Sequence, residues 1–265
     1  MTTVLKSIRI PTVEEFNDIV IGNIDENAKQ WPLMSSPIYT LMILAGYLYF
    51  CTSLGRNFME KRKPYTLDRI MITYNFIQIL MNGYLFYKTS SVLFSSDYSF
   101  FESRIDMRPD RLFFVYLYFI NKLIDLFDTI FMVLRKKNSQ ITFLHLYHHA
   151  MMPIIGWLYS AYMGAAISIF FGATNTLVHV IMYTYYLATN LNAEFKKSIW
   201  WKSRLTQLQL VQFILVTCHA LVNFLNPKSE FPGVIVAVSV PQGFIMLILF
   251  LDFYKKAYNS KNKQQ

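Results

Sequence analysis

The stretch FLHLYHHAMM, residues 143–152, places three of the chain's five histidines inside an otherwise apolar run. His145, His148 and His149 fall at i, i+3 and i+4, so a helix would carry them on one face. Three imidazoles on one face can bind a transition metal. Without a metal, a neutral imidazole serves as a proton carrier or as a nucleophile that accepts an acyl group. The spacing therefore leaves metal binding and acyl transfer open.

Polar side chains recur at helical spacing in three other apolar runs. They are Lys122, Asp125, Asp128 and Thr129 in NKLIDLFDTIF, Asn175, His179, Met182, Tyr183 and Tyr186 in NTLVHVIMYTYY, and Thr206, Gln209 and Gln212 in TQLQLVQF. A charge in the middle of a membrane span costs about 2.5–3.5 kcal/mol on insertion scales, so such residues indicate a functional site by default. Four polar stripes favour one cavity lined by all of them over several unrelated polar contacts.

Structural explanations compete for individual residues. For Asp125 alone, we prefer a structural role to a catalytic one: it would form an i, i+3 ion pair with Lys122 that holds this helix to its neighbours. For His219, which lies apart from the other four histidines, we expect a hydrogen bond between helices.

The composition indicates an integral membrane protein, because 54% of the 265 residues are hydrophobic and 15% are charged. Runs of roughly 20 apolar residues are long enough to cross a bilayer. Such runs lie at about 36–54, 68–87, 111–134, 141–160, 163–188, 203–225 and 233–253. We therefore predict an all-α, polytopic membrane protein with seven transmembrane helices, folded as a single domain over residues 1–265.

Charged residues in the connections predict the orientation of the chain. Lys and Arg accumulate in the cytosolic loops of membrane proteins, and here they gather in 56–67, 135–140, 189–204 and the C-terminal tail. The N-terminus is thus expected outside the cytosol and the C-terminus inside it. The net charge of +9 requires no nucleic acid partner, since an anionic membrane face or an anionic soluble substrate explains it.

Short signals at the two ends favour the endoplasmic reticulum membrane. The start, MTTVLKSIRIPTVEEF, lacks the apolar core of a cleavable signal peptide. In the final SKNKQQ, Lys261 and Lys263 resemble a dilysine retrieval signal of endoplasmic reticulum membrane proteins. Cys51 and Cys218 both lie in apolar runs, so we expect two small buried hydrophobic residues and not a disulfide or a metal ligand.

The histidine count bears on the metal hypothesis. A fatty acid desaturase is also a membrane protein with histidine boxes. Its di-iron centre needs several such boxes with about eight histidines, whereas this chain has five histidines in all. A mononuclear site built from His145, His149, His179 and a carboxylate remains open.

Four motifs in fixed order make the sequence resemble the ELO family of very-long-chain fatty acid elongases. They are KLIDLFDT, HLYHH, NTLVHVIMYTYY and TQLQLVQF, and the ending FLDFYKKAY also fits. The resemblance runs from about residue 30 to 258. It implies an acyltransferase of the endoplasmic reticulum that condenses a long-chain acyl-CoA with malonyl-CoA. The products would be CO2, CoA and a 3-oxoacyl-CoA two carbons longer, and no further cofactor is implied.

The resemblance also implies a fold and roles for individual residues. Six of the seven helices would ring a narrow acyl tunnel that opens to the cytosol. His148 is the candidate nucleophile, and His145 and His149 would position it. An oxyanion forms during the condensation and needs hydrogen-bond donors in a dry site. The candidate donors are Asn175, His179, Gln209 and Gln212, and the other expected contacts with substrate are Lys122, Asp125, Asp128, Thr129, Tyr183, Tyr186 and Thr206.

The chain departs from the family pattern at one position, where Asp125 replaces a glutamate and shortens the reach of the carboxylate by one methylene. Pairing with Lys122 would tolerate this change. The expected partners are the two CoA thioesters, membrane lipid and the reductase, dehydratase and enoyl reductase that complete an elongation cycle. Homodimers are common in families of this kind.

Two other classes of membrane protein share the predicted topology. A seven-span receptor would also have its N-terminus outside the cytosol, but binding an agonist does not require HLYHH. A transporter could use Lys122, Asp125 and Asp128 as an ion path. Release of CoA from acyl-CoA by the purified protein separates an elongase from both.

Overall fold

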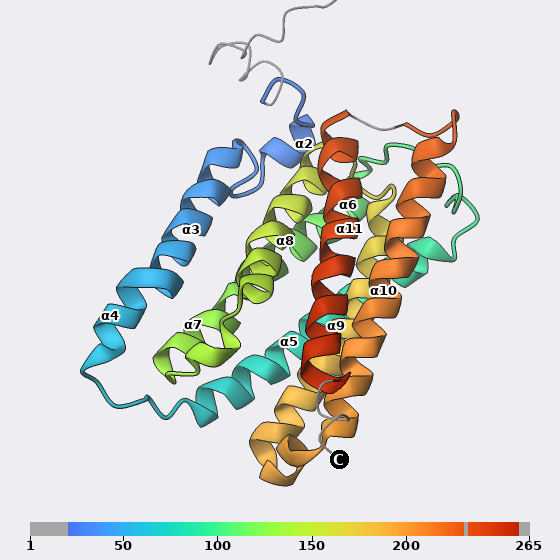
Figure 1. Ribbon diagram of the computed structural model, residues 1–265. Helices are drawn as coiled ribbons and strands as arrows, with labels where there is room; N and C mark the ends of the chain where they lie inside the picture. The colour runs from blue at the N-terminus through green and yellow to red at the C-terminus, as the bar shows by residue number, and fades with distance from the viewer. Residues whose placement is uncertain (1–20, 231–232, 260–265) are drawn as a thin grey trace, which may run out of the picture.

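The computed structural model describes residues 21–230 and 233–259, which fold into helices packed side by side (Figure 1). The α-helices are α2 (Glu26–Lys29), α3 (Pro37–Tyr49), α4 (Gly55–Glu60), α5 (Asp68–Leu93), α6 (Pro109–Ile124), α7 (Leu126–Leu134), α8 (Phe143–Tyr162), α9 (Ser168–Leu191), α10 (Ile199–Leu225) and α11 (Gly233–Tyr254). Short π-helical segments, Phe50–Leu54 and Lys255–Asn259, join α3 to α4 and follow α11. The all-helical class predicted from the sequence is confirmed, whereas Lys261 and Lys263 lie outside the described residues.

Capping residues in the sequence determine where several helices begin. The Ser36 hydroxyl caps α3, and Pro37 occupies its first position, where the missing N–H costs nothing. The Thr142 hydroxyl accepts a hydrogen bond from the His145 N–H at 3.3 Å and so starts α8. Ser198 caps α10 in the same way. The Thr142 cap places all three clustered histidines in the first two turns of α8.

The three most extensively packed pairs of helices are antiparallel, namely α5 with α9, α6 with α8, and α10 with α11 (Figure 1). Helices α6 and α8 approach closely at Gly156, where an added Cβ would lie 3.1 Å from the Phe119 Cα. The loops 61–67, 135–142 and 192–198 lie together at one end, which we call the basic end, and the loops 94–108, 163–167 and 226–230 lie at the opposite end (Figure 1).

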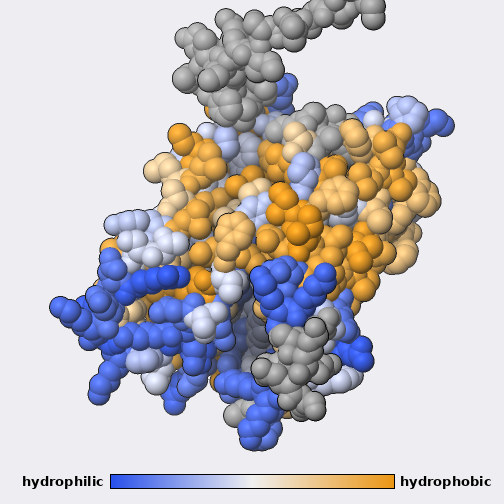
Figure 2. Space-filling view, viewed as in Figure 1, coloured by the Kyte–Doolittle hydropathy of each residue, from blue (hydrophilic) through white to orange (hydrophobic). Residues whose placement is uncertain are grey.

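Apolar side chains cover the middle of the molecule, and hydrophilic ones gather at the basic end (Figure 2). Among the described residues, three helical segments are long and apolar enough to cross a membrane by length and composition, Pro37–Glu60, Ile199–Leu225 and Ala237–Tyr258. Large apolar side chains such as Met42 and Leu225 are exposed on these segments. The chain is therefore a helical membrane protein that crosses the bilayer more than once.

The predicted continuous helix over 111–134 is interrupted at Asp125, which separates α6 from α7. The Asp125 backbone remains in the right-handed helical region, with φ −57° and ψ −20°, and its N–H still donates to the Asn121 carbonyl at 2.9 Å. The run is thus divided into two helices at a residue that keeps the helical conformation, and the membrane span over 111–134 stays a prediction.

The expectation for the two cysteines is half confirmed. Cys51 is buried, but Cys218 is exposed, and both are free thiols. Cys218 lies on the face of α10 that also exposes Val211, Leu215 and Val222. This face follows an i, i+4, i+7 spacing and points away from the polar stripe of the same helix.

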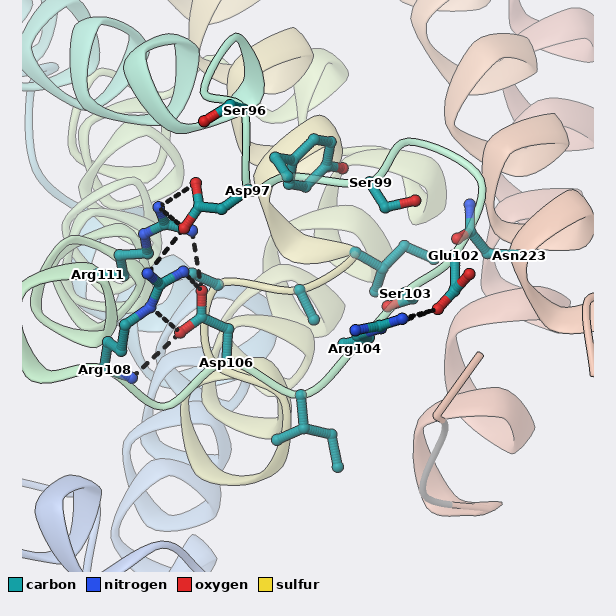
Figure 3. A pocket seen from close by; sticks show the side chains of 15 residues that line it. Ser96, Asp97, Ser99, Glu102, Ser103, Arg104, Asp106, Arg108, Arg111 and Asn223 are labelled. Carbon is teal, nitrogen blue, oxygen red and sulfur yellow. Dashed lines mark hydrogen bonds and ion pairs between the residues drawn. The ribbon is translucent and has the colours of Figure 1, made fainter. Parts of the chain in front are cut away.

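A cluster of ion pairs holds the loops at the opposite end, around a pocket of about 470 Å3 (Figure 3). The guanidinium of Arg111 donates to both oxygens of Asp97 at 2.8 Å and to Asp106 at 2.9 Å. Arg108 pairs with the same two carboxylates at 2.7 Å. The backbone of Asp106 in turn bonds to Met163 and Ala165 on either side of Gly164. An Asp106–Gly164 bridge results, and it ties the 94–108 loop to the turn between α8 and α9.

Gly164 is required at this bridge for two reasons. Its φ of +53° is strained for residues with a side chain, and an added Cβ would collide with the Asp106 carbonyl oxygen.

We expect Arg111→Ala to destabilise the protein by about 1–3 kcal/mol, because it removes a nearly buried cation shared by two carboxylates. Hydrogen bonds from Ser95 and from the arginines lower the pKa of Asp97, and Arg108 and Arg111 outweigh burial in lowering the pKa of Asp106. A carboxyl group whose pKa is lower in the folded state than in the unfolded state stabilises the fold at pH values above its unfolded pKa, which is about 4. This stabilisation is lost as the pH falls from that value toward the folded pKa. The difference in Tm between the variant and the wild type should therefore shrink below about pH 4.

Arg104→Ala is the matched control, because the guanidinium of Arg104 is 73% exposed and pairs only with Glu102 among the described carboxylates. Equal losses of Tm in the two variants would show that the cluster around Arg111 is not the source of stability.

Candidate active site

A cavity of about 740 Å3 lies between α5, α7, α8, α9, α10 and α11 and reaches the basic end. It brings together most of the site residues that the sequence predicted. Its lining includes Asp128, His145, His148, His149, Asn175, His179, Met182, Tyr186, Thr206, Gln209 and Gln212. Each of the four polar stripes contributes at least one residue to this cavity, although Asp128 alone represents the stripe that begins at Lys122.

The three histidines of α8 have different surroundings. His145 Nε2 lies 2.8 Å from the Thr129 hydroxyl, which lies 2.8 Å from the Tyr47 hydroxyl. The ring centroids of His145 and His149 lie 4.3 Å apart, and the ring planes are inclined to each other at 45°. His148 Nδ1 is buried and has no hydrogen-bond partner. His148 therefore has a ring nitrogen that no protein group occupies.

Apolar rings flank His148 on the side of α10 and α11. The centroids of Phe213 and Phe250 lie 6.5 and 6.4 Å from its ring. An apolar surround of this kind keeps water away from a reactive nitrogen and strengthens electrostatic interactions there.

Lys122, Asp125 and His179 form a charged contact from two helices. Lys122 Nζ lies 2.8 Å from Asp125 Oδ2 and 3.3 Å from His179 Nδ1, and the Lys122 and Asp125 residues are 1% and 3% exposed. An ammonium group can only donate, so His179 Nδ1 accepts, and the ring proton of the neutral histidine then lies on Nε2. The arrangement leaves His179 with an Nε2–H that can donate to a substrate.

Asp125, which stands where the family pattern has a glutamate, was expected to pair with Lys122, and the structure contains this ion pair. Further donors satisfy Asp125 Oδ1, namely Gln78 Nε2 at 2.7 Å and the Tyr183 hydroxyl at 3.0 Å. The Tyr183 hydroxyl also lies 2.8 Å from Asp128 Oδ2. One hydroxyl therefore bridges two carboxyl groups, of which only Asp128 lines the cavity.

Four of the predicted substrate contacts lie behind the cavity wall and not in its lining. These are Lys122, Asp125, Thr129 and Tyr183. Each contacts a lining residue instead: Lys122 and Asp125 face His179, Thr129 bonds to His145, and Tyr183 bonds to Asp128. Their geometry suits a role in positioning the lining residues.

The amides on the cavity wall differ in how far they are satisfied. The Asn175 amide oxygen accepts a hydrogen bond from the Tyr118 hydroxyl at 2.8 Å. Gln209 Nε2 has a weak contact with the Met182 sulfur at 3.8 Å. Gln212 Nε2 is buried without a partner. Gln212 consequently has an amide donor that no protein group satisfies and that an oxyanion could accept from.

A polar stripe on α5 was missed by the sequence reasoning. Asn75, Gln78 and Asn82 are 2%, 0% and 0% exposed. Asn82 donates to Gln78 and accepts from Asn121 on α6 at 3.1 Å. The i, i+3, i+7 spacing of three amides in the apolar run 68–87 was the signal that could have found them.

Basic side chains line the cavity where it meets the basic end. They are Arg135 and Lys137 after α7, Lys196 in the loop after α9, and Lys202 in the first turn of α10. Cations at the mouth of a cavity attract anionic ligands and bind phosphate.

The side chains that the metal hypothesis requires face different partners. His145 bonds to Thr129, and His179 Nδ1 faces Lys122, whose ammonium would repel a cation. Over the described ranges, no group of three His, Cys, Asp or Glu side chains is placed to hold a metal ion.

His219 lies outside the cavity, at the opposite end of the molecule. Its Nε2 lies 3.0 Å from the Phe100 carbonyl oxygen, and its ring packs against Phe100 and Phe170. The expected hydrogen bond thus exists, but its partner is a loop carbonyl and not a neighbouring helix. We expect His219→Ala to leave the catalytic rate within about twofold of wild type and to cost about 1–2 kcal/mol of stability, measured by an enzyme assay and by Tm.

Comparison with known proteins gives consistent results. Residues 32–265 match the family described as ELO: GNS1/SUR4 family. The chain is 42% identical over 249 residues to very long chain fatty acid elongase 7 of Rattus norvegicus. The aligned region covers 92% of this chain and 89% of that protein. It is 34% identical to elongase 1 of Mus musculus (88% and 86% covered) and 33% identical to elongase 4 of Homo sapiens (90% and 77% covered).

Proposed function

This chain belongs to the ELO family of very long chain fatty acid elongases, and we propose that it condenses a long-chain acyl-CoA with malonyl-CoA through an acyl-imidazole on His148. The observation that carries this mechanism is that His148 lines the common cavity and that its buried Nδ1 has no hydrogen-bond partner. The receptor, transporter and desaturase hypotheses have no comparable support.

In the first half-reaction, the lone pair of a His148 ring nitrogen attacks the carbonyl carbon of the acyl thioester. A C–N bond forms, the C–S bond breaks, and the CoA thiolate leaves with the imidazole proton as a free thiol. Oxygen charge develops on the acyl carbonyl during this step. Gln212 Nε2 and the Nε2–H of His179 are the candidate donors that stabilise it.

In the second half-reaction, malonyl-CoA loses CO2 and leaves an enolate of its thioester. The enolate carbon attacks the acyl carbon, the C–N bond to His148 breaks, and the imidazole regains a proton from solvent. The 3-oxoacyl-CoA product is two carbons longer than the starting acyl group, and the whole reaction consumes one proton. The exclusion of water around His148 protects the acyl-imidazole from hydrolysis.

The surroundings of the cavity fit a membrane enzyme with anionic soluble substrates. The four cations at the mouth suit the phosphates of CoA. We place the mouth and the C-terminus in the cytosol, the N-terminus in the lumen of the endoplasmic reticulum, and seven spans in the membrane, with six around an acyl tunnel. A reductase, a dehydratase and an enoyl reductase would consume the product.

The function is tested with purified protein in lipid nanodiscs, long-chain acyl-CoA and isotopically labelled malonyl-CoA. We expect CO2, free CoA and a labelled 3-oxoacyl-CoA in equal amounts. Release of CoA without chain extension would indicate a thioesterase and contradict the proposal.

A further inference from the structure

Asn75 has a buried hydrogen-bond donor that no protein group satisfies. The residue is 2% exposed, its Nδ2 has no partner, and it lines the cavity that contains His148. Leaving a buried amide donor unpaired destabilises a protein, because the donor has lost its hydrogen bond to water. A buried amide on a residue that lines a ligand cavity can regain a partner if the ligand supplies the acceptor.

The rest of the α5 stripe shows that this lack of a partner is specific to Asn75. Gln78, one turn further along α5, donates to Asp125 and to the Tyr74 hydroxyl. Asn82, one turn beyond that, is bonded to Gln78 and Asn121. Neither of these two amides lines the cavity.

Contacts of the neighbouring turns place Asn75 along the depth of the cavity. One turn toward the basic end, the Met71 sulfur lies 2.9 Å from Arg135 Nη1, and both residues line the mouth. One turn in the other direction, Gln78 reaches Asp125 beside His179. Asn75 therefore lies between the basic mouth and the charged contact that holds His179.

Consider a CoA thioester whose acyl carbon reacts at His148 while its phosphates lie at the mouth. The part of the molecule that connects these two groups must then lie beside Asn75. That part is the pantetheine arm, which carries two amide carbonyl oxygens and has no charge. An amide N–H of the protein suits such a carbonyl acceptor, whereas the lysines and arginines of the mouth suit phosphates. Both substrates have the same arm.

We propose that Asn75 Nδ2 donates a hydrogen bond to an amide carbonyl of the pantetheine arm of either CoA substrate. This inference rests on the proposed function. The contact lies away from the reacting carbon and is made equally in the ground state and the transition state. Losing it should therefore raise KM and leave kcat nearly unchanged.

The test compares Asn75→Leu with Asn82→Leu, because both residues are buried asparagines on α5 and only Asn75 lines the cavity. For Asn75→Leu we expect KM for acyl-CoA and for malonyl-CoA to rise roughly 3- to 10-fold, kcat to stay within about twofold, and Tm to stay constant or rise. For Asn82→Leu we expect a lower Tm with both KM values unchanged. A fall in Tm of Asn75→Leu without a change in KM would overturn the proposal.

Truncated substrates identify the group that Asn75 contacts. Wild-type protein should use an acyl-pantetheine thioester better than an acyl thioester of a simple alkane thiol of similar length, which lacks both amides. Asn75→Leu should lose most of this preference, as in a double-mutant cycle. Equal losses on both substrates would place the contact elsewhere and refute the assignment. If wild-type protein extends neither acyl-CoA nor the analogues, the proposed function itself has failed.

Discussion

His148→Ala should abolish formation of the 3-oxoacyl-CoA, with a loss of at least about 10³-fold in kcat, because alanine has no ring nitrogen to accept the acyl group at this position. The fold should persist, since Nδ1 of His148 makes no hydrogen bond that the variant would break. The direct measurement is the intact mass of wild type and variant after incubation with a long-chain acyl-CoA in the absence of malonyl-CoA. An acyl adduct is expected on the wild type alone.

His219→Ala is the matched control, because it removes a buried histidine that lies outside the cavity. Equal losses of activity in the two variants would contradict the assignment of His148. Product formation by a wild type that never carries an adduct would replace the acyl-imidazole with direct attack of the malonyl enolate on the thioester. That outcome would retain the condensing function and change its mechanism.

The second large effect is expected on stability. Lys122→Met leaves the Asp125 carboxylate buried beside His179 without its cation. Breaking a buried pair by removing one partner costs about 3–5 kcal/mol, which corresponds to a fall in Tm of roughly 10 °C for a chain of this size. Thermal unfolding in detergent measures the change.

The double variant Lys122→Met/Asp125→Asn separates the charge effect from packing. An asparagine oxygen can still accept from Gln78 and Tyr183, which both bond to Oδ1 of the aspartate. Removing both charges should therefore restore most of the lost stability, so the two single losses should not add. Additive losses would show that Lys122 stabilises the fold by packing and not by pairing.

Much of the candidate site could be predicted because helical periodicity is a local property. The i, i+3, i+4 spacing of His145, His148 and His149 determines that they share a face once Thr142 starts the helix. The same reasoning found the stripes of α9 and α10. It missed the stripe of α5, although Asn75, Gln78 and Asn82 follow the same rule, because an uncharged amide in an apolar run is explained by a hydrogen bond between helices and indicates a site less strongly than a charge does.

The rotation and depth of each helix could not be predicted, because they depend on packing between helices. Periodicity placed Tyr183 and His179 on one face, but only the packing of α9 against α5 and α7 decided that Tyr183 lies behind the wall and His179 within the cavity. The exposure of Cys218 has the same cause. The ion pair between Arg111 and Asp97 could not be predicted either, because Asp97 lies in a loop and helical periodicity does not relate it to Arg111.

The sequence by itself determined the class of membrane protein, the polar faces of its helices and the family, because composition, periodicity and ordered motifs are all properties of a single chain. The tertiary structure alone decided which polar atoms are satisfied and which are free. Lys122 and Asp125 neutralise each other beside His179, while His148 Nδ1, Gln212 Nε2 and Asn75 Nδ2 have no partner. The physical reason is that a hydrogen bond depends on distances of about 3 Å between atoms from different helices, and these distances exist only after the helices have packed.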